Sequence, residues 1–348
     1  MKSKVERFWI YTVQKFHFVF GYLLRLFFCY DKVDLMDTVR CRRGRIPEDL
    51  LKSLPRSLRV NNRYLPGEKI EFYIKGEELR ITVLYQFHRI LKNMDCQGTS
   101  GIEVTIKDNY GFKVNKCIFP KTSTQMYMVD TFKINGGGGY VCIGLPPFAL
   151  VESILVNKKV FIKKVKEEKE SIVVYGSSIT HGCASSRPAL AYTNILEKMT
   201  GGNVLNFGFS ESAKGEEEVI RYISSLGAKI MIVEFDHNAT IEELRKSHFI
   251  VYQTIRSITD CWIIFMSRFT GGLSITEEEE QERIRIITNT YQMAKRLYDD
   301  KIALILGNTV FGTNKRDYFV DGVHPNDLGM EVIAEAIYDV IKKRGMLN

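Results

Sequence analysis

The chain has 348 residues and a hydrophobic content of 45%, which is enough for one large or two modest buried cores and excludes an intrinsically disordered chain. Its formal net charge of +8 would suit an acidic partner. However, no basic stripe with interleaved aromatic residues runs along the sequence, so we expect no nucleic-acid partner.

Residues 1–30 combine a basic start with an aromatic-rich run from Phe16 to Tyr30. Arg25 interrupts this run, which is shorter than the roughly 20 apolar residues of a membrane-spanning helix. No small-residue cleavage pattern follows it, so we expect no signal peptide and a cytoplasmic location. We predict an aromatic-rich helix, and its packing partner stays open between this protein, another subunit and a membrane surface.

Residues 31–156 have the pattern of a β domain. From about Arg56 to Val156, short runs of β-branched and aromatic residues alternate with Gly, Asn and Asp turns. Several short strands at this spacing indicate a β-sandwich of jelly-roll type. The segment 152–170 is strongly charged, and we place the domain boundary there, after residue 156.

Residues 157–348 change to a regular alternation of strands and helices. Near-continuous apolar runs predict strands at 171–175, 203–207, 229–235, 261–266 and 302–306. Helices are predicted near 191–199, 216–226, 241–258, 276–298 and 327–343. This alternation indicates an α/β domain, with a parallel sheet covered by helices on both faces. Ligands of such sheets bind beyond the carboxyl ends of the strands.

Polar or glycine-bearing turns follow the predicted strands at this edge. They read GSSITHG from residue 176, NFGFS from 206, DHNA from 236 and, before the last helix, DGVHP from 321. A serine hydroxyl needs a neighbouring base to act as a nucleophile, and a histidine suits this role. We therefore predict Ser178 as the nucleophile and His324 as its base. Asp321, three residues earlier, would orient the imidazole.

Acyl transfer also requires hydrogen-bond donors for the oxyanion of the tetrahedral intermediate. The candidates at this edge are the backbone N–H groups of Ser178 and Gly208 and the side-chain amide of Asn238. These groups, with Asp321 and His324, complete the set of residues that the reaction needs.

These four turns resemble the sequence blocks of the SGNH or GDSL hydrolases. The resemblance covers residues 171–340 and implies a flavodoxin-like three-layer α/β/α sheet and a serine mechanism without a metal or another cofactor. Residues 30–155 are similar to the β-sandwich that precedes the catalytic domain in one bacterial subgroup. Many members of that subgroup are acetyl esterases that act on carbohydrates.

The sequence departs from the family pattern in two turns. Ser177 stands where the family usually has an aspartate, so the turn loses a carboxylate and contains two adjacent serines. We assign the nucleophile to Ser178 by its place in the block. The third turn reads DHNA instead of Gly-x-Asn-Asp, and the sandwich-bearing subgroup also tends to show this departure.

Other polar residues near these turns are weaker candidates. His181 would line the acyl pocket or, alternatively, stabilise the turn. Arg268 would contact a polar substrate or, alternatively, form a surface salt bridge. Asp236 is expected to hold the loop that presents Asn238, and the spacing of Asp236 and His237 does not indicate a metal site.

The predicted function is hydrolysis of short O-acyl esters, with an acetyl group on a carbohydrate as the substrate that the resemblance implies. The partner would be an acylated small molecule or a glycan, and the oligomeric state stays open. Two alternatives remain. One is a lipase or lysophospholipase, to which residues 1–30 would add membrane contact. The other is a non-catalytic glycan-binding protein on the same fold.

Overall fold

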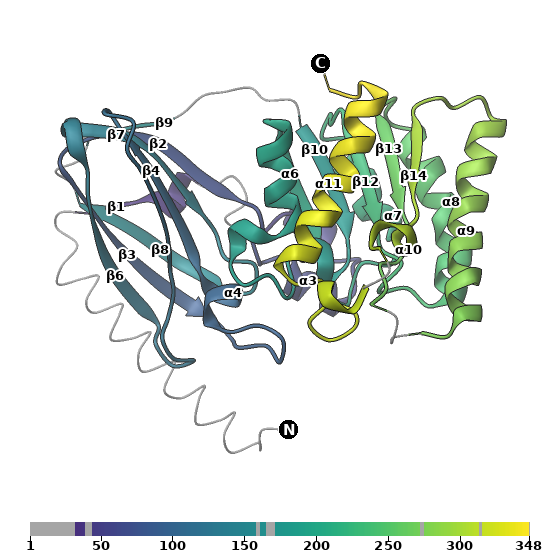
Figure 1. Cartoon of the computed structure of the whole chain (residues 1–348), viewed down its shortest axis with the longest axis horizontal. Helices are drawn as coiled ribbons and strands as arrows, with labels where there is room; N and C mark the ends of the chain where they lie inside the picture. Colours follow the sequence, from purple (N-terminus) through teal and green to yellow (C-terminus); the bar gives the residue numbers. More distant parts are fainter. Residues whose placement is uncertain are drawn as a thin grey trace. The chain divides into compact units, whose positions relative to one another are not determined.

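A computed structural model describes residues 32–38, 44–157, 161–164, 171–271, 275–312 and 315–347. They form two compact units (Figure 1). The first contains residues 32–38, 64–157 and 161–164, and the second contains residues 44–63 and the described residues from 171 onward. The helix predicted for residues 1–30 lies outside the described residues, among which no helix has the length and hydropathy of a membrane span.

The first unit consists of antiparallel strands. In chain order they are β1 (Lys32–Asp34), β2 (Lys69–Lys75), β3 (Glu78–Phe87), β4 (Ile102–Asp108), β5 (Lys113–Ile118), β6 (Tyr127–Lys133), β7 (Gly138–Gly144), β8 (Leu150–Asn157) and β9 (Phe161–Lys164). One sheet has the order β1-β8-β3-β6 and the other β5-β4-β7-β2-β9. Short helices η2 (Leu35–Thr38), α4 (Cys96–Ser100) and η3 (Asn135–Gly137) lie between strands.

The two antiparallel sheets share one hydrophobic core. Because successive side chains of a strand point to opposite faces, every second residue can be buried. Phe72 of β2, Val141 of β7 and Ile81 of β3 are among the buried residues of this core. Two sheets around a common core form a sandwich, as the strand pattern predicts.

The second unit contains a parallel sheet. Its strands are β10 (Ser171–Gly176), β11 (Asn203–Gly208), β12 (Ile230–Glu234), β13 (Trp262–Met266) and β14 (Ile302–Ile305). Their order, β11-β10-β12-β13-β14, is the flavodoxin-like order. The helices are α2 (Glu48–Leu51), α3 (Arg56–Asn61), α5 (Ser178–His181), η4 (Pro188–Leu190), α6 (Tyr192–Thr200), α7 (Glu217–Ser224), α8 (Ile241–Arg256), α9 (Glu277–Arg296), α10 (Gly307–Val310), η5 (Lys315–Tyr318) and α11 (Asp327–Arg344).

Helices cover both faces of this sheet. Val174 of β10 packs in one core with Leu196 of α6 and Ile333 of α11. Val173, the preceding residue, packs in the other core with residues of α7, α8 and α9. Figure 1 shows α6 and α11 together on one side of the strands. The three-layer fold and the five predicted strands are therefore confirmed.

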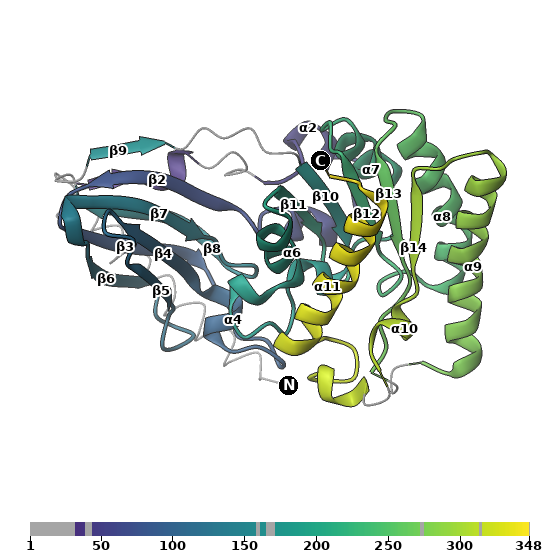
Figure 2. The same ribbon diagram turned by 45° about the horizontal axis from the view of Figure 1, so that its top comes forward.

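The structure divides the chain differently from the prediction in two places. Residues 161–164, predicted to belong to the catalytic domain, form β9, which pairs with β2 in the first unit (Figure 2). Residues 44–63, predicted to belong to the sandwich, pack in the second unit. Ile46 and Leu58 are buried in the core beneath α7 and α8, and this apolar burial explains the second difference.

Arg45 fixes this early segment to the end of β11. Its guanidinium donates hydrogen bonds to the carbonyls of Asn206 (3.0 Å), Gly208 (2.7 Å) and Asn61 (2.8 Å) and lies 4.2 Å from the ring centre of Phe209. Asn61 donates in turn to the carbonyl of Ser210 (2.9 Å). The loop after β11 is thus held by residues that lie between β1 and β2 in the sequence.

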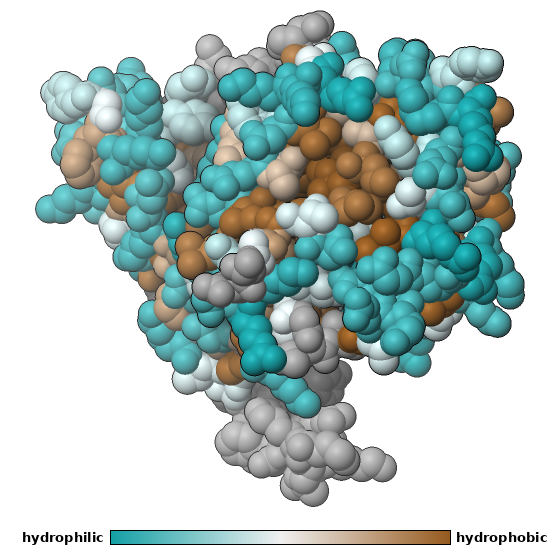
Figure 3. Space-filling view, turned by 45° about the vertical axis from the view of Figure 1, so that its right-hand side comes forward, coloured by the Kyte–Doolittle hydropathy of each residue, from teal (hydrophilic) through white to brown (hydrophobic). Residues whose placement is uncertain are grey.

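The outer edge of the parallel sheet is formed by β14, which pairs with β13. In the described part of the chain, no strand pairs with the other side of β14. Figure 3 turns forward the side on which α9 and β14 lie, and apolar side chains gather in the middle of this face.

Arg45→Ala should lower the free energy of unfolding of the second unit by about 2–4 kcal/mol, because three buried carbonyls would lose a charged donor. Denaturant unfolding in a Trp9→Phe background, followed by the fluorescence of Trp262 in β13, measures this unit. Arg59→Ala, which changes an exposed arginine of α3, is the matched control and should stay within about 0.5 kcal/mol of the wild type. Equal stability of the two variants would contradict the role of Arg45.

Candidate active site

Ser178 begins the short helix α5, directly after β10 and Ser177. Its Oγ lies 2.9 Å from Nε2 of His324, and Nδ1 of the same imidazole lies 2.9 Å from Oδ2 of Asp321. The structure therefore brings together the serine, histidine and aspartate predicted from separate turns, and it connects them by a continuous line of hydrogen bonds.

Asp321 is held in place by its own loop. Its Oδ1 accepts hydrogen bonds from the backbone N–H groups of Val323 (3.1 Å) and His324 (2.8 Å). Partial burial raises the pKa of Asp321, but the hydrogen bonds from His324 and Val323 and the charge of His324 outweigh this, so its pKa lies below the ordinary value. The carboxylate is thus ionised at neutral pH and fixes the orientation of the imidazole.

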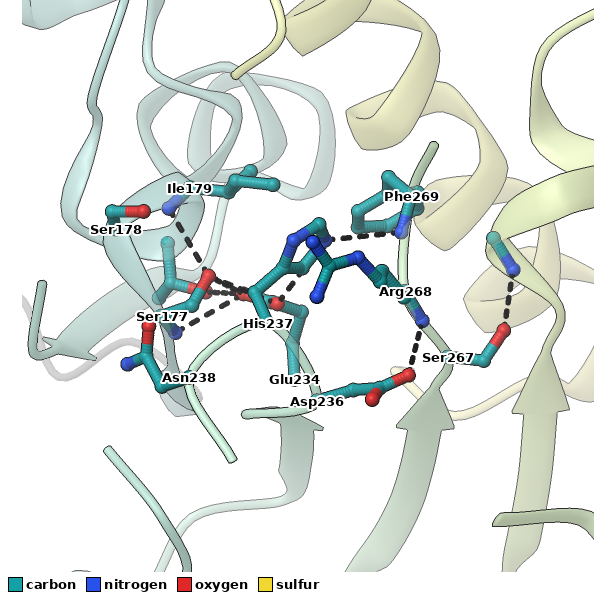
Figure 4. A network of polar contacts seen from close by, with 12 residues as sticks. Ser177, Ser178, Ile179, Glu234, Asp236, His237, Asn238, Ser267, Arg268 and Phe269 are labelled. Carbon is teal, nitrogen blue, oxygen red and sulfur yellow. Dashed lines mark hydrogen bonds and ion pairs between the residues drawn. The ribbon is translucent and has the colours of Figure 1, made fainter. Parts of the chain in front are cut away.

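The two adjacent serines have different partners. Ser177 caps α5, because its Oγ accepts the N–H of Ile179 (3.2 Å), and it donates to both carboxylate oxygens of Glu234 (3.0 and 2.9 Å). Figure 4 shows the Ser177 side chain directed toward Glu234 and the Ser178 side chain directed away from it. Of the two serines, Ser178 is the one that lies against His324.

The structure gives Gly208 a different role from the predicted oxyanion donor. Its N–H already donates to Oδ1 of Asn206 at 2.8 Å in the buried interior. A Cβ at this position would lie 2.3 Å from the backbone nitrogen of His181. Gly208 is therefore needed for the close approach of β11 to α5, and the sequence pattern could not reveal that its N–H is occupied.

The loop that carries Asn238 is fixed by buried ionic contacts. The carboxylate of Asp236 accepts hydrogen bonds from the backbone N–H of Arg268 (2.8 Å) and the guanidinium of Arg283 (2.8 Å). Arg283 also donates to the carbonyls of Asp236 and Ala239. This agrees with the expected role of Asp236, whereas Arg283, in the middle of α9, gave no signal in the sequence. The amide of Asn238 donates one hydrogen bond to the carbonyl of Phe209 at 3.0 Å.

His181 is fully buried, and its Nδ1 accepts the N–H of Ser210 at 3.3 Å. This contact matches the alternative that His181 stabilises the turn, and its burial is inconsistent with lining a pocket open to substrate. Arg268 is partly buried, and its side chain lies beside His237 (Figure 4). A substrate contact by Arg268 stays a prediction.

The side chain of His237 is buried and stacks on Phe269, and its Nε2 accepts the backbone N–H of Phe269 (3.0 Å). Burial, and then the charge of Arg268, lower the pKa of His237 well below its usual value, so the ring is neutral. Among the described residues, no group of three or more His, Cys, Asp and Glu side chains is arranged to hold a metal ion.

Glu234 is the main residue that the sequence analysis missed. It ends β12 and is fully buried. Burial raises its pKa to about 7, although hydrogen bonds from Thr180 and Ser177 act in the opposite direction. In the sequence, the only signal that Glu234 belongs to the site is its position at the end of an apolar strand, two residues before the turn that begins with Asp236.

A family model described as GDSL-like lipase/acylhydrolase matches residues 169–342, which is half of the chain and contains the whole site. The chain belongs to the GDSL-like lipase/acylhydrolase family. It is therefore a carboxylic ester hydrolase, as the resemblance implies. No curated protein matches the sequence.

Solved structures share the fold over most of the chain. A protein from Bacteroides ovatus ATCC 8483, described as a GDSL-like lipase, has a TM-score of 0.77 and 22% identity over 88% of this chain and 92% of its own. A salicylyl-acyltransferase from a tetracycline biosynthetic pathway has a TM-score of 0.73 and 15% identity over 87% and 90%. A family two carbohydrate esterase from Clostridium thermocellum has a TM-score of 0.57 and 12% identity over 82% and 94%.

Gly208→Ala should destabilise the second unit by about 1–3 kcal/mol, because its methyl group would meet backbone atoms of α5 that cannot move independently. The change should also lower kcat on an ester, since the displaced helix carries Ser178. Thermal unfolding and steady-state kinetics measure the two effects. Gly312→Ala, where a Cβ meets nothing within 4 Å, is the control. A Gly208→Ala enzyme as stable and active as the control would refute the packing argument.

Proposed function

We propose that this protein hydrolyses short O-acyl esters through an acyl-enzyme on Ser178. The observation that carries the proposal is the line of hydrogen bonds from Ser178 through His324 to the ionised Asp321. A neutral imidazole at 2.9 Å can accept the hydroxyl proton as the oxygen attacks, and the carboxylate stabilises the imidazolium that results.

The proposed reaction has two steps. The Oγ of Ser178 attacks the acyl carbonyl carbon, and its proton moves to Nε2 of His324. The alcohol leaves with that proton, which leaves the acyl group on Ser178. Water then attacks the acyl carbon, again with His324 as the base. The carboxylic acid departs, and Ser178 regains its proton.

Two donors for the oxyanion fit the structure. The N–H of Ser178, as the first residue of α5, has no intrahelical acceptor. The amide nitrogen of Asn238 carries two hydrogens, and the hydrogen bond to Phe209 uses one of them. We propose that these two groups bind the oxyanion and that Gly208 acts only by packing.

The proposed substrate is an acetyl ester of a carbohydrate. The support is the subgroup resemblance and the fold shared with the carbohydrate esterase from Clostridium thermocellum. The lipase-like acylhydrolase is the alternative, and the non-catalytic glycan-binding protein is a third reading. The length of the acyl chain that the enzyme accepts separates the first two.

Ser178→Ala should reduce hydrolysis of p-nitrophenyl acetate by at least about 10³-fold and leave the unfolding temperature nearly unchanged. Ser177→Ala retains the nucleophile and should lose about tenfold, with a cost to stability of about 1 kcal/mol from the lost helix cap. Steady-state rates and thermal unfolding of both variants test the assignment. A larger loss of activity in Ser177→Ala than in Ser178→Ala would reverse it.

Among p-nitrophenyl acetate, butyrate and octanoate, kcat/KM of the wild type should be highest for the acetate and fall with chain length. Rates that rise toward octanoate would favour the lipase-like alternative. Binding of acetylated glycans without turnover of any ester, and without dependence on Ser178, would support the non-catalytic reading. If the acetate ester is hydrolysed, release of acetate from acetylated oligosaccharides would identify the alcohol as a carbohydrate.

A further inference from the structure

A fully buried carboxylate lies beneath the turn that carries Ser178. Glu234 accepts hydrogen bonds from the Ser177 hydroxyl (3.0 and 2.9 Å), the Ser177 backbone N–H (3.2 Å) and the Thr180 hydroxyl (2.7 Å). The Thr180 hydroxyl also lies 2.7 Å from that of Tyr192, which donates to it because the proton of Thr180 is directed to Glu234. The hydrogen bonds that the Glu234 carboxylate accepts thus come from Ser177 and Thr180, which lie on either side of the nucleophile in the turn.

The backbone is shaped to admit this carboxylate. A Cβ on Gly176 would lie 2.1 Å from Oγ1 of Thr180 and 2.8 Å from Oε2 of Glu234. Any side chain at residue 176 would therefore displace the carboxylate or Thr180. The glycine makes room for the glutamate, and the two hydroxyls donate hydrogen bonds to its carboxylate. Burial of an ionisable group is costly unless such hydrogen bonds replace those to water.

On the basis of the proposed function, we propose that Glu234 is a positioning residue for the nucleophile. It fixes the Ser177–Thr180 turn so that the Oγ and N–H of Ser178 face the reacting carbonyl. It also supplies, from β12, the carboxylate that this turn lacks because residue 177 is a serine. Glu234 does not touch the substrate in this role and acts through Ser177 and Thr180.

Several charged or titratable groups face Glu234. They are Asp236 on the following loop, His237 with Nε2 4.0 Å from Oε1, Arg268 after β13 and Tyr192 through Thr180. Burial raises the pKa of Glu234 from the ordinary value of 4.5 to about 7, and the charge of Asp236 acts in the same direction. The carboxylate is therefore the better acceptor above pH 7 and becomes protonated below it.

The raised pKa of Glu234 predicts the direction in which stability changes with pH. Because the folded chain retains the proton up to a higher pH than the unfolded chain, the contribution of Glu234 to stability falls as pH rises from about 4.5 to 7. Glu234→Gln resembles the protonated form, so it should remove this part of the pH dependence of stability. Its activity should approach that of the wild type at low pH and fall below it at high pH.

The main experiment compares Glu234→Gln, Ser177→Asp and the double variant on p-nitrophenyl acetate between pH 6 and 9. Glu234→Gln should lower kcat about 10-fold at pH 8 with little change in KM, and by less at pH 6. Ser177→Asp should lose at least about 10-fold, because it would place a second carboxylate against Glu234. The double variant has one carboxylate at the turn again and should be more active than Ser177→Asp.

Two controls separate positioning from general stability. Glu216→Gln changes a partly buried glutamate, which accepts a hydrogen bond from the hydroxyl of Tyr175 (2.5 Å), and should leave the pH profile of kcat unchanged. Glu234→Asp keeps the charge on a shorter side chain and should retain more activity at pH 8 than Glu234→Gln. If Glu234→Gln does not fold, Ser177→Ala and Glu234→Asp provide the same comparison of kcat with pH.

The rate at which a fluorophosphonate labels Ser178 provides a readout that needs no ester substrate. The Oγ attacks phosphorus, fluoride leaves, and the hydroxyl proton passes to His324. Labelling of Ser178 that slows in Glu234→Gln at pH 8 and recovers relative to the wild type at pH 6 would support the inference. An active wild type with an unchanged rate and pH profile in Glu234→Gln, or a double variant no better than Ser177→Asp, would overturn it. A wild type that neither labels nor hydrolyses would overturn the proposed function itself, and this inference with it.

Discussion

The site depends on the parallel register of three neighbouring strands. Gly176 of β10 lies opposite Gly208 of β11 on one side and opposite Glu234 of β12 on the other. The backbone N–H of Ser177 donates to the carbonyl of Glu234, and that of Phe209 donates to the carbonyl of Gly176. All three strands therefore end at the same level, and their loops begin side by side. A shift of one residue in any strand would separate the serine, the carboxylate and the loop that carries Phe209.

This register also explains why two glycines stand at the strand ends. The level at which the strands end is crowded, because a helix, a buried carboxylate and the next loop all begin there. Gly176 leaves room for Glu234 and Thr180, and Gly208 leaves room for the backbone of α5. The crowding excludes water from the base of the turn, where hydrogen bonds to a charged group are strongest.

Much of this could be predicted from the sequence, because strands buried on both faces are continuous apolar runs and the turns after them hold the polar residues. The places of Ser178, Asp321 and His324 followed from this pattern. What could not be predicted depends on contacts between distant segments. The occupied N–H of Gly208 depends on how the side chain of Asn206 folds back. Glu234 was hidden because it ends an apolar strand, and only the packed structure shows which turn its carboxylate reaches.

The packing of residues 44–63 into the second unit has a consequence for how the chain folds. Arg45 hydrogen-bonds to the carbonyl of Asn206, 161 positions later, and strands β2 to β9 of the sandwich lie between them in the sequence. During synthesis, the sandwich strands leave the ribosome before β11 is made. Ile46 and Leu58 of residues 44–63 therefore stay exposed to solvent until the second unit forms. Contacts of such long sequence separation form slowly. We therefore expect the sandwich to fold first and the docking of this segment to be a late, separate phase of folding.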